Sequence, residues 1–233
     1  MISLLDMLLL FSKILYRRHR DKIIHKLFHR PIVMPWMTYT EVVLIEELLK
    51  NLKPKKCLEW GAGYGTLLFP SFINKKASWI SIEHNIDWAE KIKKLNKNSN
   101  VAIYCVLPNH FPWTDEYEDG NFSDLRDYVE FPAKLAPFDF ILVDGRARKD
   151  CLEKAYDIIG KEGLVILHDA QREHYREPLK LYKHQIFLQD YAGRAVWIGS
   201  KELSINKMFD FDKYIKLDRI FNRINNSCLK ALV

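Results

Sequence analysis

The chain has 233 residues, of which 48% are hydrophobic and 28% are charged. This composition is typical of one globular domain with a substantial core, and it excludes a disordered chain. The net charge of +6 comes with no basic run that is interleaved with aromatic residues, so no nucleic-acid partner is expected. The four cysteines are far apart and form no CxxC pair, which favours reduced thiols in a cytoplasmic protein.

Residues 1–35 form an extension that combines apolar and basic residues. Four of its apolar residues fall at helical spacing: Leu4, Leu8, Phe11 and Leu15. The basic run follows the apolar stretch, which is the reverse of a signal peptide, and the stretch is too short and interrupted to span a bilayer. Two interpretations stay open. The amphipathic helix packs on its own domain or on a partner subunit of a homo-oligomer, or residues 1–30 contact the inner face of a membrane.

From residue 36 onward, strand patterns alternate with helix patterns. Thr38 and Glu41 fit a capping box, which predicts a helix that ends before Pro54. The elements expected next are a strand over residues 57–60, a glycine-rich loop, a helix through residue 72, a strand over residues 79–84, a helix capped by Asn85 and a strand over residues 102–107.

The second half begins with an irregular acidic stretch, residues 108–137, which is too long for a simple connection. After it we expect a strand over residues 138–145, a helix over residues 151–160 and a strand over residues 163–170. Residues 184–192 and 194–201 are expected to form a closing antiparallel pair around Gly193.

This order of elements predicts an α/β fold with a doubly wound, seven-stranded, Rossmann-like sheet whose last strand is antiparallel. The continuous apolar runs FILV and LVIL support strands that are buried on both faces. The expected organisation is an N-terminal helical extension (1–35), one main domain (36–201) and a helical C-terminal tail (202–233).

The loop after the first strand carries three glycines at alternate positions: Gly61, Gly63 and Gly65. In doubly wound sheets ligands bind at the carboxyl ends of the strands, and glycines allow a ligand to approach the backbone closely. A dinucleotide fingerprint needs a glycine where this chain has Thr66.

Two acidic residues accompany the loop. Glu59 leads it and suits the ammonium group of an amino-acid ligand, whereas Glu83 ends the second strand and suits two ribose hydroxyls. An adenosyl group joined to an amino acid, without pyrophosphate, describes S-adenosylmethionine. The glycine loop and its acids therefore favour this cofactor over a dinucleotide.

The chain resembles the class I S-adenosylmethionine-dependent methyltransferases from about Trp36 to Gly199, in the motifs LEWGAGYGT, WISIEHN, FDFILVDGR and GLVILHDA. Its VDGRAR run, followed by an HD ending, is similar to a subgroup with glycan and small-molecule O-methyltransferases. The resemblance implies a methyltransferase sheet and S-adenosylmethionine as cofactor. The cofactor-binding residues it implies are Glu59, Gly61, Gly63, Gly65, Glu83 and Asp144.

Polar residues follow the fourth and fifth strands and are expected to converge near the methyl donor: Asp144, Arg146, His168 and Asp169. Transfer to a hydroxyl requires removal of its proton, and the ordinary pKa of a histidine, about 6.5, suits His168 to that role. Asp144 or Asp169 would orient His168 or act as the base. The alternative is that His168 only forms a hydrogen bond at a strand end.

A divalent metal is a second open mechanism, because some related O-methyltransferases hold one at the ends of these strands. Asp144 and Asp169 offer the oxygen ligands that magnesium or calcium-like ions prefer. The chain departs from the metal pattern at Ala170, where a second Asp or Asn would be usual. Metal dependence therefore stays open.

A group of arginines follows the same strands: Arg146, Arg148, Arg172 and Arg176. Guanidinium groups suit carboxylates or phosphates, so an acidic sugar or a sugar phosphate is one hypothesis for the substrate. The other interpretation is that these arginines pair with the acidic residues of the 115–130 segment.

These observations predict a methyltransferase that acts on an oxygen of a sugar or another small hydroxylated metabolite. One alternative is a nicotinamide-dependent oxidoreductase with the same architecture. The other is a non-catalytic protein of this fold that serves as a binding or membrane-associated scaffold. No Asn/Asp-Pro-Pro-Tyr signature follows the fourth strand, which disfavours methylation of nucleic-acid bases.

Overall fold

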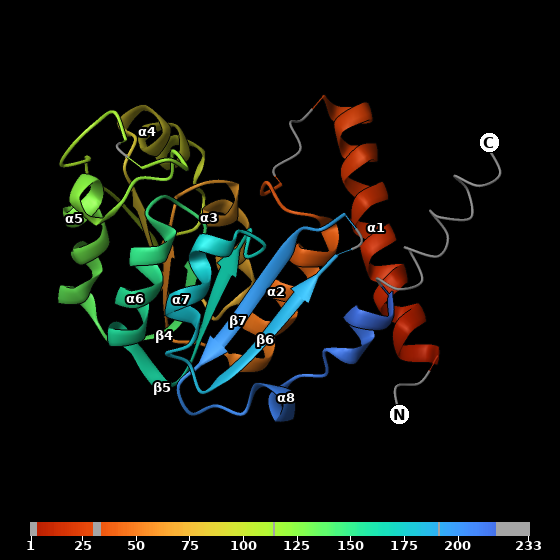
Figure 1. Ribbon diagram of the computed structural model, residues 1–233. Coiled ribbons are helices and arrows are strands. Elements are labelled where there is room, and N and C mark those ends of the chain that lie inside the picture. The colour runs from red at the N-terminus through yellow and green to blue at the C-terminus, as the bar shows by residue number, and fades with distance from the viewer. Residues whose placement is uncertain (1–3, 30–33, 114, 191, 218–233) are drawn as a thin grey trace, which may run out of the picture.

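The computed structural model describes residues 4–29, 34–113, 115–190 and 192–217 (Figure 1). These residues form a seven-stranded sheet in the order β3-β2-β1-β4-β5-β7-β6. The neighbours β1 to β5 are parallel, and β7 runs antiparallel to both β5 and β6. The predicted fold class, including the antiparallel last strand, is confirmed.

The strands are β1 (Lys56–Trp60), β2 (Ser78–Glu83), β3 (Val101–Cys105), β4 (Phe138–Val143), β5 (Ile159–His168), β6 (His184–Gln189) and β7 (Ala195–Ser200). The helices are α1 (Leu4–Phe28), α2 (Tyr39–Leu52), α3 (Tyr64–Leu68), α4 (Ile86–Leu95), α5 (Phe122–Glu130), α6 (Arg148–Ile158), α7 (Arg176–Leu179) and α8 (Ile205–Met208). Short 3-10 turns cover Phe69–Phe72, Phe131–Leu135 and Glu173–Tyr175.

Helix α2 begins at the predicted capping box. The backbone N–H of Glu41 donates to Thr38 Oγ1 at 3.1 Å, and the backbone N–H of Thr38 donates to the Glu41 carboxylate at 2.6 Å. Two backbone groups that a helix start leaves unpaired are thereby satisfied. At its other end, Lys53 adopts a left-handed conformation just before Pro54, as the sequence predicts for a helix stop.

The acidic stretch differs from the prediction because it contains helix α5. Asn121 caps this helix by accepting hydrogen bonds from the backbone N–H groups of Ser123 and Asp124. Leu125 of α5 is buried and belongs to the core on the α6 side of the sheet. The helix after β4 also begins earlier than expected, at Arg148, and β5 already begins at Ile159.

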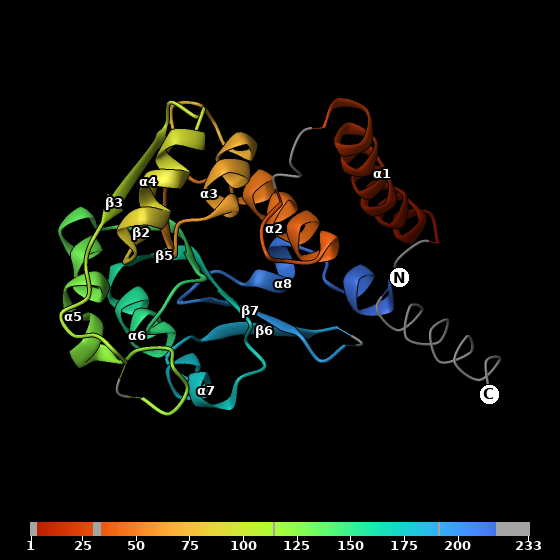
Figure 2. The ribbon, with the colours of Figure 1, turned by 90° about the horizontal axis from the view of Figure 1, so that it is seen from above.

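Helices cover both faces of the sheet, as Figure 2 shows with α2, α3 and α4 on one side and α5, α6 and α7 on the other. Alternate strand residues therefore enter two cores. Phe140, Leu142, Leu164 and Ile166 join the α2 core, whereas Ile141, Val143, Val165 and Leu167 join the α6 core. Asp144 follows Phe140 and Leu142 at the same spacing of two residues, and His168 follows Leu164 and Ile166. Both therefore lie on the α2 side of the sheet.

Helix α1 packs on the same core as α2, and Phe11 of the predicted face contacts this core, but the most buried residues are others. Leu10 and Ile14 are buried, whereas Leu8 is 53% exposed. The side chain of Leu4, and residues 1–3 and 30–33 of the predicted extension, lie outside the described part of the chain. None of the described helices is long and apolar enough to cross a membrane.

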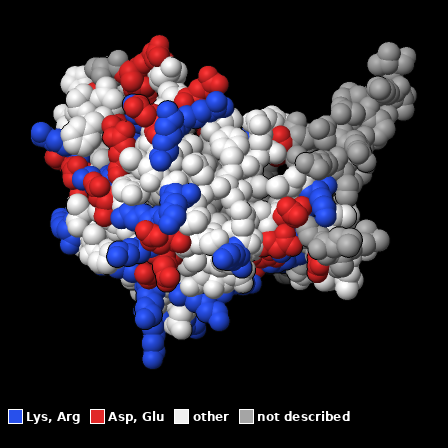
Figure 3. Space-filling view, turned by 60° about the horizontal axis from the view of Figure 1, so that its bottom comes forward, with Lys and Arg blue, Asp and Glu red and all other residues white. Residues whose placement is uncertain are grey.

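The described part of the C-terminal tail includes α8 and further helical residues, 212–217. Phe209, Phe211 and Tyr214 join the core of α2, and Tyr214 donates a hydrogen bond to Glu47 at 2.8 Å. Residues 218–233 of the predicted tail, Cys228 among them, lie outside the description. On the face of the molecule in Figure 3, basic side chains alternate with acidic ones rather than forming one continuous basic surface.

Candidate active site

The order of the strands reverses between β1 and β4, and the loops that follow these two strands lie back to back. The backbone N–H of Asp144 donates to the carbonyl of Trp60 at 2.9 Å. Gly61 has a φ of +94°, and a Cβ there would lie 2.6 Å from Cα of Gly145. The first glycine of the loop is therefore required by the close approach of two loops as well as by its backbone conformation.

The other two glycines of the loop face different surroundings. A Cβ at Gly65 would lie 2.6 Å from Oε1 of Glu59, so this glycine makes room for a buried carboxylate. A Cβ at Gly63 would meet nothing within 4 Å. Of the three glycines predicted to cradle a ligand, Gly63 is the one beside open space.

Glu59 lies beneath this loop, and its carboxylate is bound by the protein. Its Oε2 accepts hydrogen bonds from Thr66 Oγ1 at 2.6 Å, from Ser81 Oγ at 2.7 Å and from Trp79 Nε1 at 3.0 Å. Burial raises the pKa of Glu59 to about 7, against the opposing effect of these hydrogen bonds. Glu59 thus ties the loop to β2, and its predicted contact with an ammonium group stays a prediction.

Glu83 ends β2 at the same edge of the sheet. It is buried, and its Oε1 accepts a hydrogen bond from the backbone N–H of Asn85 at 2.9 Å. The neighbouring β1 strand continues into the glycine loop, where the N–H of Gly61 donates to the carbonyl of Ile82 at 2.8 Å. Glu83 therefore lies beside the glycine loop, and its role toward a ribose stays a prediction.

His168 and Asp144 meet at the ends of β5 and β4. Nδ1 of His168 lies 2.8 Å from Oδ1 of Asp144. Burial would lower the pKa of His168, but the hydrogen bond and charge of Asp144, together with the charges of Asp169 and Glu41, outweigh it and raise the pKa above 6.5. Because Nδ1 donates to Asp144, Nε2 is left as the acceptor of the ring.

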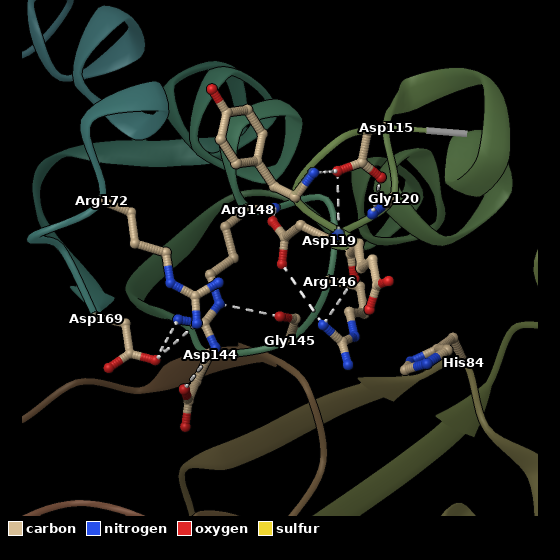
Figure 4. Close-up of polar contacts among 12 residues, drawn as sticks. His84, Asp115, Asp119, Gly120, Asp144, Gly145, Arg146, Arg148, Asp169 and Arg172 are labelled. Atoms are coloured by element: carbon tan, nitrogen blue, oxygen red, sulfur yellow. Dashed lines mark hydrogen bonds and ion pairs between the residues drawn. The ribbon is translucent and has the colours of Figure 1, made fainter. Parts of the chain in front are cut away.

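Arg148, at the start of α6, binds both carboxylates next to this histidine (Figure 4). Its guanidinium lies 3.4 Å from Asp144 and 3.2 Å from Asp169, and it donates to the carbonyl of His168 at 2.8 Å. Burial would lower the pKa of Arg148, yet the charges of Asp144 and its other neighbours raise it. This buried cation holds the ends of β4 and β5 in a fixed arrangement.

A third acid, Glu41, reaches the histidine from the first turn of α2. Its Oε1 lies 3.8 Å from Nε2 of His168, while the same carboxylate caps the helix. The capping pattern identifies Glu41 in the sequence, but no sequence signal connects it with His168. The interaction arises only because α2 packs over the end of β5.

Arg146 does not converge with the other predicted catalytic residues, because its side chain turns toward the acidic stretch (Figure 4). Its guanidinium donates to the carbonyl of Glu118 at 3.1 Å and lies 3.8 Å from Asp119. The expected position is filled by Arg148, two residues later, which the sequence places only in the group of arginines that follows these strands.

The donor set does not fit a divalent metal between the two aspartates. Arg148 already supplies a positive charge between Asp144 and Asp169, and Ala170 offers no further oxygen ligand. Within the described ranges, no group of three or more His, Cys, Asp or Glu side chains is placed to hold a metal ion. The metal hypothesis therefore gains no support from these residues.

A cavity of about 290 Å³ borders Glu41 on the side of the β6–β7 hairpin. Its walls include Leu44 of α2 and Phe187 and Val196 of the hairpin. Val196 is the cross-strand partner of His168, so the cavity adjoins the end of β5. Its charged lining residues are Glu41, which lies near His168, and the ion-paired Asp190 and Arg194. Apolar walls with a few polar groups are features of a small-molecule site.

Comparison with known proteins defines the fold class. No protein-family model matches the chain, and no curated protein sequence matches it. Solved structures do match, with TM-scores above 0.5, and they include methyltransferases. The chain therefore has the Rossmann-like fold of the class I methyltransferases, as the motifs predict.

Three of the similar structures illustrate this likeness. The O-methyltransferase TomG of Streptomyces achromogenes, solved with S-adenosylmethionine, is 14% identical, with a TM-score of 0.53 over 80% of this chain and 89% of that chain. An O-methyltransferase of Bacillus cereus, in complex with S-adenosylhomocysteine, is 15% identical, with a TM-score of 0.54 over 82% and 91% of the two chains. A methyltransferase of Geobacter sulfurreducens is 15% identical, with a TM-score of 0.53 over 78% and 87%.

Proposed function

We propose that this chain is an S-adenosylmethionine-dependent methyltransferase that methylates an oxygen of a sugar or another small hydroxylated metabolite. The observation that carries the proposal is the pair His168 and Asp144, which stands beside an open glycine loop where the strand order reverses. The structural likeness to O-methyltransferases supports the same function.

The cofactor would bind along the ends of β2, β1 and β4. Gly63 leaves the backbone open to it, Glu83 at the end of β2 would bind its ribose, and Asp144 would border the site from β4. S-adenosylmethionine supplies an electrophilic methyl group when bound. The residues of this chain must then align the acceptor oxygen and remove its proton.

His168 is the base in this proposal. Its Nδ1–H donates to Asp144, so Nε2 takes the proton of the acceptor hydroxyl. Glu41, 3.8 Å from Nε2, and Asp144 both stabilise the imidazolium that results. Arg148 fixes Asp144 and thereby the orientation of the imidazole ring.

The acceptor would occupy the cavity beside Glu41. A volume of about 290 Å³ suits a single ring or a short chain, and Phe187 and Val196 offer it apolar contacts. The proposal of an acidic substrate finds less support. Arg146 is directed to the acidic stretch, and Arg148 is bound by two aspartates.

Neither alternative function is favoured by a specific observation. Thr66, which replaces the third glycine of a dinucleotide fingerprint, is fully buried and bonded to Glu59, so it is built into the loop. The scaffold alternative does not account for the buried His168, which lies 2.8 Å from Asp144, 3.8 Å from Glu41 and 4.0 Å from Asp169.

Calorimetric titration with S-adenosylmethionine and S-adenosylhomocysteine tests the proposal first. We expect micromolar binding of both, unchanged by magnesium, followed by methyl transfer to hydroxylated acceptors that persists in a chelator. Absence of heat and of thermal stabilisation with either ligand would overturn it. Loss of transfer in the chelator would restore the metal hypothesis.

A further inference from the structure

Helix α1 carries apolar residues on two different faces. Leu10 and Ile14, which face the domain, are 3% and 6% exposed. Seven other apolar side chains of the helix are more than half exposed, and Leu8 and Phe28 are two of them. The remaining five lie on one side: Leu5, Leu9, Tyr16, Ile23 and Leu27 are 63%, 58%, 68%, 54% and 66% exposed. We call these five residues the outer stripe.

The outer stripe runs along the length of the helix, with the polar residues Ser12 and Arg20 in the turns between its members. Its members are separated by four, seven, seven and four positions, which at 3.6 residues per turn places them within about 40° of arc. Leu10 and Ile14 lie about 140° away around the helix axis. The outer stripe is therefore a second apolar face rather than a scatter of exposed residues.

Ion pairs fix which face of α1 meets the domain. Lys13 of α1 forms ion pairs with Glu46 of α2 at 3.4 Å and with Glu47 at 3.2 Å. Glu46 also pairs with Arg17 of α1. The Glu46–Arg17 pair is largely buried, with side chains 4% and 11% exposed, and together with the Lys13 pairs it holds α1 in one rotation. Figure 2 shows the helix at the edge of the molecule, where its outer side is free of the described elements.

The charge of α1 indicates what covers the outer stripe. The helix has six lysines and arginines and two aspartates, and after Lys13 and Arg17 have paired with α2 four of these cations are left. Arg20 and Lys26 flank the stripe on its two sides, each within about 80° of its centre. Arg20 also pairs with Asp21 of the same helix at 2.8 Å. A second copy of the same helix would bring like charges together, whereas an anionic lipid surface complements them.

We propose that the outer stripe docks on the surface of an anionic membrane. In this arrangement α1 lies parallel to the surface, its five apolar side chains enter the boundary between headgroups and acyl chains, and Arg20 and Lys26 contact lipid phosphates. The ion pairs with α2 then hold the domain against the membrane. This inference is independent of the proposed enzymatic function.

The test is cosedimentation of the full chain, without cofactor, with two kinds of vesicle. One kind is pure phosphatidylcholine, and the other contains about a quarter phosphatidylserine. We expect binding to the anionic vesicles only, weakened as salt is raised. Leu9→Ser/Ile23→Ser should lower the affinity at least tenfold, because two apolar side chains leave the stripe.

A matched variant controls for the loss of apolar surface. Leu107→Ser/Leu181→Ser removes two side chains of similar exposure, 56% and 46%, outside α1, and should bind as the wild type does. Arg20→Gln/Lys26→Gln keeps the stripe and should reduce both the affinity and its salt dependence. Thermal melting checks that each variant is folded.

Three results would overturn the proposal. The first is a wild-type chain that does not bind anionic vesicles. The second is a Leu9→Ser/Ile23→Ser variant that binds these vesicles as tightly as the wild type does. The third is a dimer in sedimentation equilibrium that this variant dissociates, which would assign the outer stripe to a second copy. None of these results bears on cofactor binding, so the proposed function stands or falls separately.

Discussion

The surroundings of the His168 side chain favour its charged form. Asp144, Asp169 and Glu41 together raise its pKa, although burial acts in the opposite direction. Such a histidine is a stronger base than a free imidazole, but it is available as a base only above its raised pKa. The same carboxylates that stabilise the imidazolium would thus set the pH range of the proposed reaction.

The rate of methyl transfer should depend on pH accordingly. With saturating cofactor and acceptor, the wild-type kcat should rise with pH through a pKa above 6.5, the ordinary value for histidine. Asp144→Asn removes the largest contribution that raises this pKa. It should therefore move the rise to lower pH and reduce the maximum about 100-fold. An unmoved profile would assign the titration to another group.

Glu59 makes the stability of the fold depend on pH. Its pKa of about 7 in the folded protein exceeds the usual 4.5, so the folded state holds the proton more tightly between these values. The free energy of unfolding should fall as pH rises through this window, by on the order of 3 kcal/mol.

Chemical denaturation of Glu59→Gln between these pH values tests this effect. The variant should lose most of the pH dependence, because the amide has no proton to release and its oxygen still accepts from Thr66 and Ser81. Glu162→Gln, a change at an exposed position, should keep the wild-type slope. Equal slopes in the wild type and Glu59→Gln would show that the buried carboxyl is ionised throughout.

At the level of elements, two glycines of the loop serve the packing of the fold, and the third lies where a ligand could bind. Gly61 and Gly65 pack against Gly145 and Glu59, whereas Gly63 borders open space. The three glycines are evenly spaced in the sequence, but each position has a glycine for a different physical reason. Substitutions should therefore separate stability from binding.

Gly65→Ala should lower the free energy of unfolding by about 1–3 kcal/mol, because the new methyl group would stand 2.6 Å from the Glu59 carboxylate. Gly63→Ala should leave the melting temperature nearly unchanged and weaken S-adenosylmethionine at least tenfold. Melting curves and calorimetry of both variants make the comparison. If Gly63→Ala binds the cofactor normally, the ligand does not approach the backbone there.

At the level of the whole molecule, two acids on α2, the buried Glu46 and the half-buried Glu47, join α1 and the last described residues to the domain. Glu46 pairs with Lys13 and Arg17 of α1 and with Lys50 of its own helix. Glu47 pairs with Lys13 and with Lys213 near the C-terminal end of the described chain. Burial would raise the pKa of each acid, but Lys50 beside Glu46 and Lys213 beside Glu47, with the other bound groups, lower it.

Glu46→Gln should lower the free energy of unfolding by about 2 kcal/mol near neutral pH, because two cations of α1 lose a buried partner. The difference from the wild type should shrink as pH falls below the usual pKa of 4.5, where the carboxylate itself becomes protonated. Lys50→Gln removes only a half-exposed partner and should cost much less. Urea denaturation of the two variants at both pH values distinguishes these outcomes.

The sequence by itself determined the strands, most of the helices and their order, but not helix α5. The capping box of Thr38 and Glu41, the cap at Asn85 and the apolar strand runs are local patterns, and local backbone preferences largely decide such features. The alternation of strands with helices then restricts the topology to a parallel, doubly wound sheet. The edge that gathers polar residues follows from the same alternation, since parallel strands end on one side.

Only the tertiary structure decided which side chains meet. Glu41 reaches His168 from a distant helix, Arg148 takes the position expected of Arg146, and Glu59 turns beneath the glycine loop. The buried face of α1 likewise depends on where Glu46 and Glu47 present their charges. These contacts join residues far apart in the chain. They are set by packing and by the pairing of buried charges, which no local pattern records.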